Sequence, residues 1–162
     1  MKQLPERKPN RLKSFDYSQN GAYFITICTK NSEHTLSHIT VGTSIARPQE
    51  ILLTETGRIV DKAIKEIPKR YEGVFVDNYV IMPNHIHMII RIEGYDGRPM
   101  VAPTISRIIQ QMKGYATKQA GKPIWQNKAY DHIIRDDYDY MVRYQYIDDN
   151  PANWLLKRDE YN

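Results

Sequence analysis

The sequence has 162 residues, which suits one domain with an adequate hydrophobic core. Hydrophobic residues make up 41% and charged residues 26%, and no apolar run reaches the length of a membrane span or of a signal peptide. Cys28 has no second cysteine to pair with, which excludes an internal disulfide. These features together predict a cytoplasmic protein that crosses no membrane.

Positive charge is concentrated near the N-terminus. The formal net charge is +4, and residues 1–13 carry five Lys or Arg against one Glu, so this segment accounts for the whole excess. We therefore expect a basic arm over residues 1–16 and a single domain over residues 17–162. The arm fits a phosphate-binding tail or a solvated terminus. Its candidate phosphate contacts are Arg7, Lys8, Arg11 and Lys13.

Hydrophobic periodicity gives the secondary structure in chain order. Four main strands are predicted over residues 22–29, 74–82, 85–92 and 124–135. Short apolar pieces at residues 38–41 and 50–53 are expected to pair as a two-stranded ribbon. Three helices are predicted over residues 54–71, 103–120 and 138–149. We expect Asn150-Pro151 to end the third helix, because proline disfavours a helical residue before it.

The order of these elements points to one fold. Strand, helix, strand, strand, helix and strand form the split βαβ pattern of a ferredoxin-like domain. The prediction is therefore an α+β fold with an antiparallel sheet, helices on one face and an additional C-terminal helix. No glycine-rich phosphate loop precedes the second helix.

The stretch with the most chemistry lies between the two middle strands. Pro83 lacks an amide proton, so Pro83-Asn84 is expected to break the apolar run into two strands. His85 and His87 then point to the same face of the second strand, because side chains alternate along a strand. Two imidazoles at this spacing can hold one metal ion or bind phosphate, or they can be hydrogen-bonded structural residues.

Two further polar residues share a face of the third helix. Tyr146 and Asn150 are four residues apart, so a phenol and an amide oxygen project together. Set against the His pair, they offer a nucleophile and a third metal ligand. The alternative is that Tyr146 is an aromatic core contact and Asn150 a residue at the helix C-terminus.

The motif His85-Ile86-His87, following Pro83-Asn84, resembles the His-hydrophobic-His motif of the single-tyrosine HUH transposases. The resemblance is strongest to the REP-associated tyrosine transposases. Supporting stretches, in the order and spacing of that family, are residues 17–26, 80–84, 125–126, 131–135 and 146–151. They span nearly the whole chain, so the set is more specific than a lone His-x-His. Residues 30–53 depart most from the family pattern.

The resemblance implies roles for individual residues. His85, His87 and Asn150 would be metal ligands, and Tyr146 would be the nucleophile. Two imidazoles and an amide oxygen with open positions suit Mg²⁺ or Mn²⁺ better than Zn²⁺, although the ligand types also allow Zn²⁺. 

Three other residues compete for a role in this chemistry. Tyr144 and Tyr130 are alternative nucleophiles, but Tyr144 lies about 200° around the helix from Tyr146, so both cannot face one metal ion. His132 is expected to be structural or to contact DNA.

The resemblance also implies the reaction and the partners. The expected activity is cleavage and rejoining of single-stranded DNA through a 5′-phosphotyrosine, with single-stranded or hairpin DNA as the substrate. Arg135 and the basic arm are expected to contact DNA phosphates. The family includes monomers and dimers, and in a dimer Tyr146 could act on the His pair of the partner.

Two other functions fit parts of the sequence. A module that binds structured DNA without cutting it would need no Tyr146 and Asn150 on the face of the His pair. A phosphodiesterase with two His-x-Thr/Ser motifs would need a second motif, for which His38-Ile39-Thr40 is a poor candidate.

Overall fold

The computed structural model describes residues 20–44, 47–94 and 103–160. The predicted basic arm lies outside these residues, as do its four candidate phosphate contacts, Arg7, Lys8, Arg11 and Lys13.

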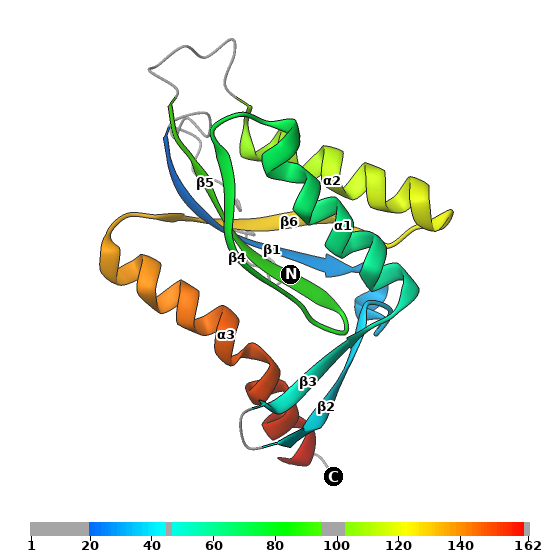
Figure 1. The fold of residues 1–162 in the computed structure, drawn as a ribbon. Helices are drawn as coiled ribbons and strands as arrows, with labels where there is room; N and C mark the ends of the chain where they lie inside the picture. Colours follow the sequence, from blue (N-terminus) through cyan, green and yellow to red (C-terminus); the bar gives the residue numbers. More distant parts are fainter. Residues whose placement is uncertain (1–19, 45–46, 95–102, 161–162) are drawn as a thin grey trace, which may run out of the picture.

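An antiparallel sheet with the strand order β4-β5-β1-β6 forms the centre of the fold. Its strands are β1 (Gly21–Thr29), β4 (Val74–Ile81), β5 (His85–Ile92) and β6 (Trp125–Ile134). With helices between the first and second and between the third and fourth of these strands, the topology is the predicted ferredoxin-like one (Figure 1).

Two helices, α1 (Glu55–Arg70) and α2 (Ile105–Ala120), pack side by side on one face of the sheet (Figure 1). Each begins at a threonine cap. Thr54 Oγ1 accepts a hydrogen bond from the backbone N–H of Gly57 at 3.0 Å, and Thr104 caps α2 in the same way. Gly121 ends α2 in the left-handed conformation, with φ of 67°.

Because side chains alternate along each strand, those of the central strands contribute to two separate cores. On β1 and β5, one set of alternate residues is buried beneath α1 and α2; it consists of Tyr23, Ile25, Ile27, Ile86, Met88, Ile90 and Ile92. The other set, which includes Phe24 and Ile89, belongs to a smaller core under α3 (Asp137–Glu160). The helices therefore cover both faces, with α3 alone crossing the face opposite α1 and α2.

A ribbon of two strands, β2 (Ser37–Ser44) and β3 (Arg47–Leu53), follows the short 3₁₀ turn η1 (Lys30–Ser32). The predicted pairing of residues 38–41 with 50–53 is confirmed, and both strands are longer than predicted. The ribbon contacts the end of α3 that lies far from β6 (Figure 1).

No helix in the described part of the chain is long and apolar enough to cross a membrane.

The predicted end of the third helix at Asn150-Pro151 is wrong, because α3 continues through Pro151 to Glu160. Proline removes one helical hydrogen bond, but packing on both sides of it offsets this loss. Ile147, Asn150 and Pro151 are buried, and Trp154 and Leu155, one turn further on, pack against the smaller core. Asn150 is therefore an interior helical residue rather than a C-terminal one.

Candidate functional site

The His pair lies on the face of β5 that α3 covers. His85 and His87 point to the same side, as the alternation predicted, and their ring centroids are 4.7 Å apart. His87 is buried, with 5% of its surface exposed, and its ring stacks on Phe24 of β1 at 5.2 Å. Both imidazoles are thus fixed by the sheet rather than by a loop.

Each imidazole is also held through its Nδ1 atom. His87 Nδ1 forms a 2.8 Å hydrogen bond with Thr26 Oγ1 on the neighbouring strand. His85 Nδ1 lies 2.6 Å from Asn84 Oδ1, which accepts its proton. A hydrogen bond at Nδ1 orients a ring and leaves Nε2 as the atom that can bind a metal ion.

The protonation of the pair suits metal binding. Burial lowers the pKa of His87 to about 3, with a smaller contribution from His85. Burial also lowers the pKa of His85, and a hydrogen bond with the Asn150 side chain opposes this change. At neutral pH His87 is therefore uncharged, which is the form of imidazole that binds a metal ion.

Asn150 projects from α3 to the His pair. It is buried, with 7% of its surface exposed, and its side chain hydrogen-bonds with that of His85. Its Nδ2 donates to the backbone carbonyl of Tyr146 at 3.3 Å, so the amide oxygen is turned away from the helix. Within the described residues no three His, Cys, Asp or Glu side chains form a metal cluster. Two imidazoles and an amide oxygen meet here instead, and all three are groups that divalent ions accept as ligands.

Tyr146 lies beside the pair on the same helix. Its ring meets the ring of His87 edge to face at 5.3 Å and that of Phe24 at 5.9 Å. Tyr146 is 46% exposed, so the residue is open to solvent although it contacts a buried imidazole. The structure therefore brings together all four residues singled out from the sequence: Tyr146, His85, His87 and Asn150.

The competing tyrosines have other environments. Tyr144 packs on Tyr140 at 6.1 Å, near β4, on another side of α3. Thr26 on β1 pairs with His87 on one side and with Tyr130 on the other. Tyr130 therefore lies on the same face of the sheet as His87, but two strands away from it. Of these three tyrosines, Tyr146 is the one whose ring contacts the His pair.

His132 and Arg135 lie where β6 leads into α3. His132 Nε2 is 2.7 Å from Asp139 Oδ2, and the backbone N–H of Arg135 donates to the same oxygen at 3.4 Å. His132 therefore links β6 to the first turn of α3, while the side chain of Arg135 is exposed.

Arg143 is a residue of the site that the sequence did not reveal. Its Nε donates to Asp139 Oδ1 at 3.3 Å, and its Cζ lies 5.3 Å above the ring of Phe24. Since Phe24 also contacts His87 and Tyr146, a guanidinium group lies close to the candidate site. The sequence signal for Arg143 was its position three residues before Tyr146, since residues three apart on a helix are neighbours.

A bulge in β4 fixes α3 on the sheet. The register shifts between Val76 and Asn78, so that Asp77 and Asn78 both reach α3. Asp77 accepts hydrogen bonds from the guanidinium of Arg91 and, at 2.8 Å, from the hydroxyl of Tyr140. Asn78 Nδ2 donates to Asp148 Oδ1 at 2.9 Å and to the carbonyl of Tyr144. These bonds lie on both sides of Tyr146 along the helix and set its position.

Comparison with known proteins agrees with this architecture. No protein-family model matches the chain. The chain is 35% identical over 171 residues to an uncharacterized protein of Haemophilus influenzae, covering 93% of this chain and 91% of that protein. 

The chain was also compared with solved structures. The structure of a REP-associated tyrosine transposase bound to a REP hairpin matches with a TM-score of 0.65 at 23% identity, over 88% of this chain and 73% of that one. A candidate transposase of Deinococcus radiodurans matches over 86% of this chain and 95% of its own, with a TM-score of 0.48 and 13% identity. The first likeness confirms the predicted fold and, at the level of the fold, the resemblance inferred from the sequence.

Proposed function

We propose that this chain, which belongs to the same family as the Haemophilus influenzae protein, is a transposase-like enzyme. Its fold, which is that of a REP-associated tyrosine transposase, supports this proposal. Its reaction would be the cleavage and rejoining of single-stranded DNA. The observation that carries this proposal is the convergence of Tyr146 and Asn150, from α3, on the paired imidazoles of β5. 

The reaction follows from what a tyrosine can do to a phosphodiester. Tyr146 Oη attacks the phosphorus, the bond from phosphorus to the 3′ oxygen breaks, and that oxygen leaves with a proton as a free 3′-hydroxyl. The phenol proton is lost to solvent or a base, and the DNA 5′ end stays on Tyr146 as a phosphotyrosine. A 3′-hydroxyl attacking this ester reverses the step and joins the strands. Each step exchanges one phosphodiester for another, so no nucleotide cofactor is required.

The residues around Tyr146 supply what its phenol lacks. A phenol has a pKa of about 10 and is a weak nucleophile at neutral pH, so the phosphate must be activated. A Mg²⁺ or Mn²⁺ ion held by His85, His87 and Asn150 would polarise a phosphate oxygen and stabilise the charge of the transition state. 

Arg143 adds a permanent positive charge on the same side of the helix. Its Nε is held by Asp139, so its terminal N–H groups stay available for a phosphate oxygen.

The test is a denaturing gel of the purified protein with single-stranded oligonucleotides from the DNA flanking its own gene, in Mg²⁺ or Mn²⁺. Labels at the 5′ and 3′ ends identify each fragment. We expect a protein-linked band that carries the fragment 3′ of the cut, and we expect Tyr146→Phe to abolish it. Tyr144→Phe is the matched control on the same helix and should keep the band. Binding on a native gel, without an adduct on any hairpin tried, would instead indicate the non-cleaving DNA-binding module.

A further inference from the structure

A groove of about 610 Å³ lies between β2 and the C-terminal part of α3. No role was expected for it from the sequence. Its lining residues are His34, Ser37, His38, Ile39, Thr40, Pro83, Trp154, Lys157 and Arg158. They come from three parts of the chain: the start of the ribbon, the turn before β5, and the turns of α3 that follow Pro151.

The groove lies next to the candidate active site. The ring of Trp154 lies 6.2 Å from that of His85, and Pro83 belongs to the turn that leads into β5. Trp154 follows Asn150 by one helical turn, so it shares the face of α3 that meets the His pair. A DNA strand with one phosphate at His85 and His87 would therefore have its neighbouring nucleotides close to the groove.

The charge of the groove suits a polyanion. No Asp or Glu is among its described lining residues, whereas Lys157, Arg158 and two histidines are. Lys157 and Arg158 are exposed, and no described carboxylate forms an ion pair with either. Both cations are thus available to a phosphate backbone.

Trp154 supplies an aromatic surface in the same place. Its ring packs edge to face with that of His34, with 5.2 Å between the ring centroids. The Trp154 side chain is partly buried against the smaller core. A fixed tryptophan beside unpaired cations is the combination that binds single strands, because every base can stack on an aromatic ring. A duplex offers no unstacked base to such a ring.

We propose that this groove binds the single-stranded DNA that adjoins the phosphate attacked by Tyr146. One base stacks on Trp154, and the backbone phosphates next to it contact Lys157 and Arg158. The inference rests on the proposed function for the position of the attacked phosphate, and it adds the site that holds the flanking nucleotides.

The first test uses binding rather than cleavage, with every variant in a Tyr146→Phe background. Fluorescence anisotropy measures the affinity for oligothymidylate and for single strands flanking the gene. The pair Lys157→Ala and Arg158→Ala should weaken binding about tenfold or more at about 0.1 M salt. It should also reduce the slope of log Kd against log salt by about 1.4, since a single strand releases about 0.7 counterion per neutralised phosphate.

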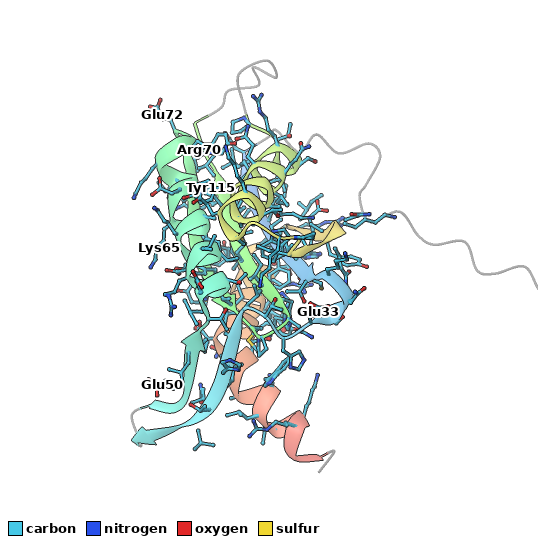
Figure 2. All side chains as sticks on the ribbon, turned by 90° about the vertical axis from the view of Figure 1, so that its right-hand side faces the viewer. Glu33, Glu50, Lys65, Arg70, Glu72 and Tyr115 are labelled. Carbon is cyan, nitrogen blue, oxygen red and sulfur yellow. The ribbon has the colours of Figure 1, made fainter. Side chains whose placement is uncertain are left out.

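The matched control is the pair Lys65→Ala and Arg70→Ala. It removes the same two residue types from exposed positions on α1, away from α3 (Figure 2). We expect its affinity to stay within about twofold of the parent, because these charges lie on the opposite face of the sheet. Equal losses for the two pairs would overturn the proposal, since binding would then follow net charge. A blunt duplex whose binding the Lys157 and Arg158 variants weaken as much as that of a single strand would overturn it too.

The second test follows Trp154 itself. A stacked base quenches tryptophan fluorescence, so oligothymidylate should quench the parent protein, and Trp154→Phe should remove most of that change. Trp154→Phe should keep its affinity within about threefold, whereas Trp154→Leu should lose about tenfold, because leucine has no ring to stack on. Unchanged quenching in Trp154→Phe would overturn the proposal. Thermal melts identify a variant that does not fold, in which case the exposed Lys157 and Arg158 pair decides.

The two proposals fail in distinguishable ways. If the protein with Tyr146 intact forms no covalent adduct but the groove variants weaken single-strand binding, the cleavage reaction is wrong and the groove stands. If the adduct forms and the groove variants bind like the control pair, the groove is wrong and the reaction stands.

Discussion

At the scale of single residues, the two imidazoles are held in place by hydrogen bonds from neighbouring side chains. Thr26 and Asn84 each form a hydrogen bond with one Nδ1 atom, which orients both rings. The His pair could be predicted from the spacing of two residues on a strand. Thr26 could not, because it is 61 positions from His87 and pairs with it through the register of β1 and β5.

Thr26→Val removes the hydroxyl that orients His87 while keeping the shape of the side chain. Partners of this kind contribute about 10–100-fold to metal affinity, so Mn²⁺ binding measured by calorimetry should weaken by that factor. Thr26→Ser keeps the hydroxyl and should bind within about threefold of the wild type. Wild-type affinity in Thr26→Val would show that the hydrogen bond does not support a metal ligand.

Asn150 gives a second prediction at this scale. Asn150→Ala removes an oxygen ligand and should weaken Mn²⁺ binding, whereas Asn150→Asp supplies a charged oxygen and should strengthen it. Asn153→Ala, at an exposed position on the same helix, is the control and should change nothing. If Asn150→Ala and Asn153→Ala bind Mn²⁺ alike, Asn150 is not a ligand.

At the scale of elements, α3 differs most from what its sequence predicted. Pro151 indicated an end, but the helix continues because the turns on either side of it are buried against the sheet and the ribbon. Sequence rules for proline describe local backbone preferences and contain no term for such tertiary packing. The bulge at Asp77 and Asn78 was hidden for a similar reason, since one extra residue hardly disturbs an apolar strand pattern.

Asp77 joins this bulge to both Arg91 and Tyr140, so it is central to the docking of α3. Asp77→Ala removes the acceptor of the Tyr140 hydroxyl and leaves the Arg91 guanidinium with Glu93 as its carboxylate partner. The free energy of unfolding in urea should fall by about 2 kcal/mol, as for hydrogen bonds to charged groups. Glu66→Ala breaks an exposed pair with Lys69 on α1 and should leave the free energy of unfolding almost unchanged. Equal costs for the two variants would mean that the bulge does not anchor α3.

At the scale of the whole molecule, the two faces of the sheet have separate roles. The α1 and α2 face holds the larger core, and the α3 face holds the His pair, Tyr146 and the groove. The order of strands and helices along the chain, and the buried face of each helix, could be predicted because periods of two and 3.6 residues mark them in the sequence. The groove could not, because its walls are more than 100 residues apart in the chain and become neighbours only through the path of α3.

If the His pair and Asn150 form one metal site in the folded chain, Mn²⁺ should stabilise the whole fold. Ligand at a hundredfold excess over Kd adds about 2.7 kcal/mol to the free energy of unfolding, which raises Tm by several degrees. His85→Ala combined with His87→Ala should abolish the increase, while His38→Ala, on the exposed ribbon, should keep it. An increase that survives the loss of both histidines would place the ion elsewhere.

Tandem mass spectrometry of the trapped adduct would identify the residue that forms the covalent intermediate. After cleavage of a flanking single strand in Mn²⁺, nuclease and protease digestion leaves a nucleotide on one peptide of α3. The proposed mechanism predicts a 5′-linked nucleotide on Tyr146 in the wild type and none in Tyr146→Phe. A nucleotide on Tyr144 or Tyr130, or one linked through its 3′ end, would contradict it.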